Sequence, residues 1–251
     1  TAGAAPLILA LVVLCWIASL VRRDSSLVDR IWGFGFVLLA HHHGTVAAAQ
    51  GGRVDRLLAT LVLIWGLRLT WHITRRNWGH REDPRYAAMR TRNGARWWWQ
   101  SLFTVFVLQG GLMLLIGLPL TAIAAPGATW GRVLGTLLWA VGFAFEAGGD
   151  WQLTRFRANP ANRGQVLETG FWRYSRHPNY FGDALQWWGF WCFAAATGLW
   201  WTVLSPVLMT VLLLKVSGVT LLESALVNSK PAYREYIRRT PAFFPWWPKD
   251  R

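Results

Sequence analysis

The ten residues from Tyr174 to Asp183 carry the densest polar chemistry of this chain. They combine cations, hydrogen-bonding rings, an amide and a carboxylate, and they lead directly into an apolar segment. Charge and polarity at the edge of a membrane are costly unless they meet a partner. The run therefore indicates a binding site, and a cofactor is the first candidate ligand.

A second polar segment, from Asp150 to Gly164, lies just upstream and contains three arginines and two asparagines. Arginine presents a planar fork of donors that binds phosphate at two points. A solvated basic loop that touches lipid headgroups is the alternative for any single arginine. Asp150, Asn179 and Asp183 differ, because they lie at or inside apolar segments, where an unpaired polar group is costly.

The elements that position these residues are apolar blocks. The chain of 251 residues is 53% hydrophobic and only 15% charged, and its hydrophobic residues gather in blocks near the length that crosses a bilayer. The tryptophans at 97–99 and 246–247 flank such blocks, as aromatic belts at a membrane surface do. We therefore expect an integral membrane protein, with a large soluble helical protein as the alternative.

Seven blocks predict an all-α fold, a single-domain bundle of seven transmembrane helices. The expected spans are residues 4–21, 31–49, 55–74, 101–122, 131–153, 179–197 and 199–226. Glycines and prolines within them are tolerable, because helices in a bilayer pack closely at small residues and can kink.

The net charge of +14 follows the same layout. Basic residues concentrate after the first, third, fifth and seventh spans, whereas Arg53 and Arg56 after the second are a weak exception. The positive-inside bias then predicts an outside N-terminus and a cytoplasmic C-terminus. This distribution argues against nucleic acid as a partner and for membrane lipids.

Cysteine and histidine patterns do not predict a metal site. Cys15 and Cys192 lie alone inside apolar blocks, without metal-type spacing. His41, His42 and His43 are consecutive, and on a helix their side chains point about 100° apart, so they cannot converge on one ion.

The stretch Gly170–Asp183, with Asp150 and Arg157 upstream, resembles the C-terminal half of the membrane steroid 5α-reductases. The whole chain is similar to the bacterial branch of that superfamily, the DUF1295 group, most clearly over a cofactor-binding half at about residues 146–248. The resemblance implies seven transmembrane helices and NADPH bound on the cytosolic side. It also implies reduction of the carbon–carbon double bond of an apolar enone such as a 3-oxo-Δ4 steroid.

Carried over by position, the resemblance implies twelve cofactor-binding residues. They are Asp150, Arg157, Asn162, Arg163, Tyr174, His177, Asn179, Asp183, Lys215, Glu223, Tyr233 and Tyr236. Asp183 stands where many members have glutamate, and Tyr233 and Tyr236 match a C-terminal Tyr-x-x-Tyr pattern.

Two other functions stay open. The segment from Arg176 to Gly182 also resembles the isoprenylcysteine carboxyl methyltransferases, which bind S-adenosylmethionine there. The number of arginines favours a dinucleotide, which has more phosphate to hold. A non-catalytic lipid-binding or scaffold protein is the third possibility.

Enone reduction requires a donor that takes up the charge developing on the carbonyl oxygen. In the steroid enzymes a glutamate and a tyrosine do this. Here we expect Asp29, whose pKa would rise on desolvation, and His72 near the end of the third span. The alternatives for Asp29 are a helix N-cap or a surface pair with Arg30. We expect the protein to be a monomer, and we expect its apolar substrate to enter from the bilayer.

Overall fold

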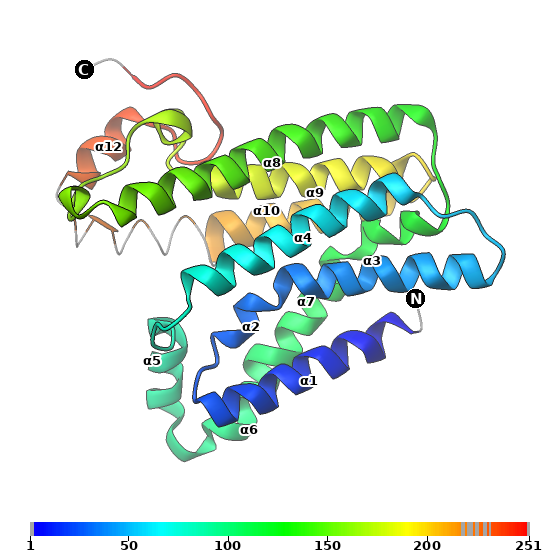
Figure 1. Ribbon diagram of the computed structural model, residues 1–251, viewed down its shortest axis with the longest axis horizontal. Coiled ribbons are helices and arrows are strands. Elements are labelled where there is room, and N and C mark those ends of the chain that lie inside the picture. Colours follow the sequence, from blue (N-terminus) through cyan, green and yellow to red (C-terminus); the bar gives the residue numbers. More distant parts are fainter. Residues whose placement is uncertain are drawn as a thin grey trace. The chain divides into compact units, whose positions relative to one another are not determined.

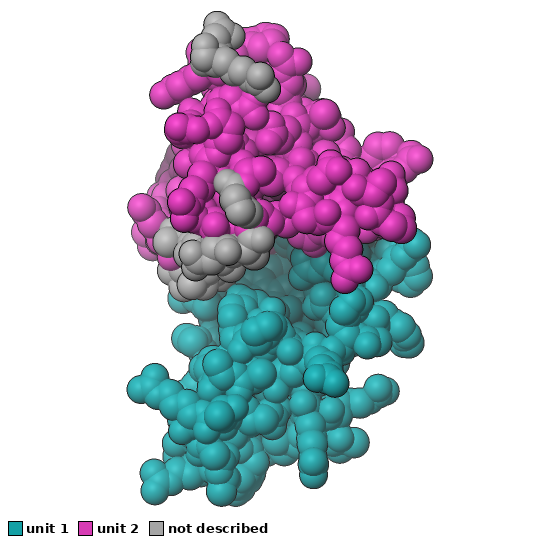
Figure 2. Space-filling model, turned by 90° about the vertical axis from the view of Figure 1, so that its left-hand side faces the viewer, with its two compact units in different colours: residues 1–128, 197–199 teal, residues 129–196, 200–251 magenta. Residues whose placement is uncertain are grey.

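The computed structural model describes residues 3–216, 219, 223, 226, 227, 230 and 232–249, and these form helices without any strand (Figure 1). The chain divides into two compact units (Figure 2). Residues 1–128 and 197–199 form the first unit, and residues 129–196 and 200–251 form the second. The expected cofactor-binding half, 146–248, lies in the second unit apart from residues 197–199.

The first unit is built around three long helices. Its elements are α1 (Ala4–Arg22), α2 (Leu27–Arg30), α3 (Trp32–Ala49), α4 (Arg56–Arg76), α5 (Pro84–Asn93), η1 (Gly94–Arg96), α6 (Trp97–Ser101), the π-helical η2 (Leu102–Val107), α7 (Leu108–Ile116) and η3 (Leu118–Ala124). Helix α3 packs against both α1 and α4. At the contact of α3 with α4, a Cβ built at Gly66 would lie 2.6 Å from Gly33 O, so only glycine permits this approach.

Local signals start two of these helices. Asp55 precedes α4 and accepts hydrogen bonds from the backbone of Leu57 and Leu58 at 3.1 and 3.2 Å. Asp83 accepts from Arg85 N at 2.9 Å, and Pro84 occupies the first position of α5. Both aspartates satisfy backbone donors that have no partner within the helix.

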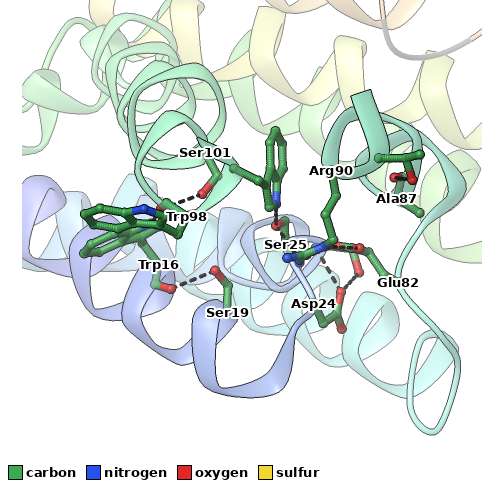
Figure 3. Close-up of polar contacts among 12 residues, drawn as sticks. Trp16, Ser19, Asp24, Ser25, Glu82, Ala87, Arg90, Trp98 and Ser101 are labelled. Atoms are coloured by element: carbon green, nitrogen blue, oxygen red, sulfur yellow. Dashed lines mark hydrogen bonds and ion pairs between the residues drawn. The ribbon is translucent and has the colours of Figure 1, made fainter. Parts of the chain in front are cut away.

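A polar cluster holds the short elements of the first unit together (Figure 3). Glu82, in the loop before α5, accepts from Ser25 N at 2.7 Å and pairs with Arg90 at 2.8 Å. Arg90 and Trp97 both donate to the Ser25 hydroxyl oxygen at 3.3 Å. The cluster thus joins the turn after α1 to the loop after α4 and to helices α5 and α6.

In the second unit, α9 packs against α8 and against α10 (Figure 1). The elements of this unit are α8 (Thr129–Ala158), η4 (Pro160–Asn162), η5 (Gly170–Arg173), α9 (Pro178–Ala195), η6 (Trp200–Val203), α10 (Leu204–Val211), the π-helical η7 (Leu212–Val216) and α12 (Tyr233–Arg239). Proline at the first position of α9 has no backbone N–H to leave unpaired, which favours a helix start there.

Glycines bring α8 and α9 close together. A Cβ built at Gly142 would lie 2.6 Å from Gly182 O, and one at Gly135 would lie 2.7 Å from Gly189 O. One turn beyond the first pair, the buried Gln186 donates to Glu146 Oε2 at 2.6 Å. The close approach aligns the end of α8 with the start of α9, where we expect the site.

Three helices among the described residues are long and apolar enough to cross a membrane: α1, α4 and the continuous stretch Pro84–Ile116. Helices α3, α8 and α9 have nearly the bounds expected for spans, but their length and composition do not identify them as membrane-crossing helices. The seventh expected span begins with η6, α10 and η7 and then lies partly outside the described residues. Seven crossings therefore remain a proposal.

The fourth expected span, 101–122, has different bounds in the structure. Its helix already begins before Trp97 and ends at Ile116, and the 3₁₀ segment Leu118–Ala124 follows. The reason is local: Gly117 weakens the helix, and Pro119 has no N–H to donate to a preceding turn.

Candidate functional site

A cavity of about 430 Å³ lies in the second unit, within the roughly 300–1,000 Å³ of small-molecule sites. The end of α8, the loop after it, the turn before α9 and helix α12 line it. Six of the twelve residues expected to bind a cofactor are in its wall: Arg157, Asn162, Arg163, His177, Tyr233 and Tyr236. The structure thus brings together residues that are up to 79 positions apart in the sequence (236 − 157).

The cavity wall is strongly positive. It includes Arg157, Arg163, Arg176 and Lys230, and no carboxylate is among the described lining residues. Lys230 Nζ donates to Gln165 O at 2.6 Å. Burial and the positive charge of Arg157 lower the pKa of Lys230 below its ordinary value. Basic side chains that line one cavity, with no carboxylate among the described lining residues, suit an anionic ligand.

Glu223 neutralises one of these cations from behind the wall. Arg176 forms a two-point pair with it, with Nε at 2.7 Å from Oε1 and Nη2 at 3.1 Å from Oε2. His177 Nε2 lies 3.0 Å from the same Oε1. The cavity wall therefore keeps a net positive charge, to which Arg163 and Lys230 contribute.

His177 presents a further polar atom. Its side chain is 1% exposed, and its Nδ1 is buried without a hydrogen-bond partner among the described residues. In a neutral imidazole with Nε2 directed at a carboxylate, Nε2 carries the proton and Nδ1 can accept a hydrogen bond. A buried acceptor without a partner, in a residue that lines the cavity, is suited to a ligand donor.

The C-terminal segment fixes the turn that carries His177. Arg176 N donates to Pro241 O at 2.9 Å, and the Ser175 hydroxyl donates to Phe243 O at 2.8 Å. The Tyr236 hydroxyl, buried in α12, donates to Trp172 O. Tyr236 therefore holds the turn in place as well as lining the cavity.

The other cofactor candidates lie outside the lining. Asn179 Nδ2 donates to Asp150 Oδ1 at 3.0 Å, which joins the start of α9 to α8. Asp183 is half-buried one turn further along α9, and Lys215 is exposed on η7. The Tyr174 ring packs edge-on against Trp247 with ring centroids 5.3 Å apart.

In the first unit, Asp29 belongs to a network that its neighbours in sequence did not indicate. Its carboxylate accepts from the Tyr86 hydroxyl at 2.8 Å and from Arg85 at 3.4 Å. The alternatives of an N-cap and an Arg30 pair are wrong, because Ser26 and Ile31 occupy the N-cap positions of α2 and α3 and Arg30 pairs with Asp24 at 3.2 Å. Burial raises the pKa of Asp29, as expected for a desolvated carboxyl.

Tyr86 is a candidate that sequence reasoning missed. It is buried, it donates to Asp29, and its oxygen accepts from Gln109 Nε2 at 3.1 Å. The 57 positions between Tyr86 and Asp29 leave no sequence signal for this contact. His72, the other candidate, is half-buried on α4. Among the described residues, no three His, Cys, Asp or Glu side chains are placed to hold a metal ion.

Comparison with known proteins gives a family match over most of the chain. The model of a family described as "Protein of unknown function (DUF1295)" matches residues 15–240. An uncharacterized protein of Schizosaccharomyces pombe is 26% identical, over 92% of this chain and 75% of its own length. No solved structure matches the chain.

Proposed function

The chain belongs to the DUF1295 family, and we propose that it is an integral membrane reductase of seven spans that uses NADPH. Its reaction would reduce the carbon–carbon double bond of an apolar enone, such as a 3-oxo-Δ4 steroid. The observation that carries this proposal is a cavity wall that contains several basic side chains and no carboxylate among the described lining residues. NADPH has three phosphates to occupy such a wall.

The charge of the cavity also separates the two candidate cofactors. S-adenosylmethionine carries a sulfonium cation and no phosphate, so a positive wall repels its reactive centre. Arginine in turn binds phosphate through two parallel hydrogen bonds. The arrangement of Arg157, Arg163 and Lys230 therefore favours the reductase over the methyltransferase.

Each cavity residue has a role that its contacts support. Arg157, Arg163 and Lys230 would bind phosphate, and Asn162 and Gln165 would hold the loop that carries them. Asn162 Nδ2 donates to Phe156 O at 2.9 Å, and Gln165 N donates to Asn162 O at 3.0 Å. His177 Nδ1 would accept a hydrogen bond from the ligand. Asp150, paired with Asn179, would keep the start of α9 in register with α8.

NADPH, when bound, would supply a hydride and become NADP+. The enone would gain this hydride at its β carbon and a proton from water at its α carbon, with negative charge on its carbonyl oxygen in between. A hydrogen-bond donor at that oxygen lowers the barrier. We keep Asp29 and His72 as candidates for this role; Tyr86, which donates its hydroxyl proton to Asp29, would hold that carboxyl in place.

A binding and turnover experiment tests the proposal. The purified protein in detergent should bind NADPH, and it should consume NADPH in the presence of a 3-oxo-Δ4 steroid. Arg157→Ala should weaken NADPH binding about tenfold or more, because a hydrogen bond to a charged group contributes about 1.5–3 kcal/mol.

Arg155→Ala is the matched control. Arg155 lies on the same helix, but its guanidinium stacks over the Trp151 ring at 5.0 Å and does not line the cavity. This variant should bind NADPH like the unchanged protein. Binding of S-adenosylmethionine with methyl transfer, and no NADPH oxidation with any enone, would overturn the reductase.

A further inference from the structure

A second pocket, of about 630 Å³, also lies in the second unit. We call it the basic pocket, and its lining includes Glu168, Arg173, Arg239, Trp247 and Lys249. It shares no lining residue with the cavity of the proposed cofactor. A ligand in it would therefore be independent of that function.

The charges of the basic pocket do not cancel. Arg239 donates to the Glu168 carboxylate at 2.6 Å, and this pair uses the single carboxylate of the described lining. Arg173 and Lys249 are exposed, and neither has an ion-pair partner among the described residues. Two positive charges are thus left for a ligand of opposite sign.

Backbone hydrogen bonds give the pocket a defined wall. Lys249 N donates to Arg239 O at 2.9 Å, and Trp246 N donates to Tyr174 O at 2.9 Å. The Trp247 ring packs on Tyr174, and the Arg173 guanidinium lies 6.0 Å from the centre of the same Tyr174 ring. The C-terminal segment is therefore held in place, and its Lys249 and Trp247 line the same pocket as Arg173.

The aromatic residues of this segment point to the source of the ligand. Phe244, Trp246 and Trp247 are 69%, 72% and 67% exposed. Large exposed aromatic rings next to cations are typical of segments that lie in the interface between water and bilayer. A free anion in water would not require them.

We propose that the basic pocket binds the headgroup of an anionic phospholipid, with Arg173 and Lys249 on its phosphate and Trp247 against its glycerol and acyl part. The pocket would then anchor the C-terminal segment, and with it the turn that α12 and this segment hold, to the membrane surface.

Titration with short-chain lipids tests this site. Dioctanoyl phosphatidylglycerol should bind to the protein in detergent, as measured by calorimetry, and dioctanoyl phosphatidylcholine should bind much more weakly. The double variant Arg173→Ala, Lys249→Ala should bind phosphatidylglycerol about 30-fold more weakly, since each basic residue at an anionic surface contributes about fivefold.

The control removes two positive charges from a different place, helix α12. Arg234→Ala, Arg238→Ala removes two exposed arginines of α12 that do not line the basic pocket, and its affinity should stay within twofold of the unchanged protein. Trp247→Ser should weaken phosphatidylglycerol binding and leave inorganic phosphate unaffected. Equal loss in both double variants, equal affinity for the two lipids, or inorganic phosphate bound as tightly as phosphatidylglycerol would overturn the proposal.

Discussion

Lys230 shows at the scale of one residue how the cavity is charged. Its amine lies in the wall with Arg157, and burial and that arginine lower its pKa. It therefore loses its charge at a lower pH than an ordinary lysine. If it binds a phosphate, the affinity for NADPH should be full near neutral pH and fall as the pH rises through this lowered pKa.

Two substitutions isolate this effect. Lys230→Arg keeps a charge across the whole range, because arginine does not deprotonate in proteins, so its affinity should stay level where that of the unchanged protein falls. Lys230→Met should bind NADPH about tenfold more weakly at neutral pH, by loss of one charge-assisted hydrogen bond. Dissociation constants for NADPH, measured from pH 7 to 10 for the unchanged protein and both variants, test whether Lys230 is the group that titrates. The same decline in the arginine variant would show that another group titrates.

The sequence was informative about residues that act through local patterns. Arg157 at the end of α8 and Asn162 and Arg163 in the loop after it are close in the sequence, and the resemblance by position predicted that they share one site. Lys230 and Tyr86 could not, because their partners come from distant parts of the chain. The sequence around a long polar side chain does not show which distant residue that side chain will contact.

At the scale of elements, the closeness of α8 and α9 depends on glycine. A Cβ at Gly182 would collide with the carbonyl of Gly142, which is backbone and cannot move aside. Gly182→Ala should therefore destabilise the protein by about 1–3 kcal/mol, as overpacking in a tight interior does. A lowered midpoint of thermal unfolding in detergent would show this.

Gly111→Ala provides the comparison for that variant. Gly111 also lies inside a helix, α7, but a Cβ there meets nothing within 4 Å. Alanine is the better helix former, so this variant should unfold at the same temperature as the unchanged protein or above it. Equal destabilisation by the two alanines would contradict a steric role for Gly182.

Glu82 links several elements of the first unit and predicts a pH dependence. Burial alone would raise its pKa, but the hydrogen bonds from Arg90 and Ser25 outweigh burial and hold the pKa below its ordinary value. Because the folded-state pKa is the lower one, the stability from this carboxylate is present above its ordinary pKa of 4.5 and is lost as pH falls through the folded-state value.

Glu82→Gln should accordingly be less stable than the unchanged protein at pH 7, by about 1.5–3 kcal/mol for the lost charged hydrogen bonds. The difference should shrink as the pH is lowered below 4.5. Unfolding midpoints at several pH values measure it. A constant difference at all pH values would mean that the amide disturbs packing rather than charge.

The helix bounds were the part of the fold that apolar blocks predicted well. Helices α1, α3, α4, α8 and α9 begin and end within five residues of the expected spans. The fourth span was displaced, since Trp97 and its neighbours continue a helix that starts in a charged region. Hydropathy shows which block of residues suits a bilayer. A helix can extend beyond that apolar block wherever hydrogen bonds and caps stabilise the added turns.

At the scale of the whole molecule, the number of crossings decides where the cavity lies. Length and composition mark three spans among the described residues, whereas the basic loops favour seven. The two arrangements place the loops differently. In the seven-span arrangement, the loops after α4 and α8 face the cytoplasm, and the loops before α8 and after α9 face outside.

Labelling of single cysteines distinguishes the two arrangements. The native Cys15 and Cys192 are buried, so they give a quiet background for a membrane-impermeant maleimide. The test positions are His80→Cys, Ala128→Cys, Ala161→Cys and Thr197→Cys, all in loops or turns between the long helices. Seven spans predict that His80→Cys and Ala161→Cys react only from the cytoplasmic side and the other two only from outside.

Three spans predict a different grouping, because the chain would not cross the membrane again after Ile116. Ala128→Cys, Ala161→Cys and Thr197→Cys would then react from one side and His80→Cys from the other. Only the seven-span result puts the cation-lined cavity, reached through the loop at Ala161, on the same side as the loop after α4 and opposite Ala128 and Thr197. With that result a cytoplasmic dinucleotide can reach Arg157 and Lys230 while an apolar substrate enters from the bilayer.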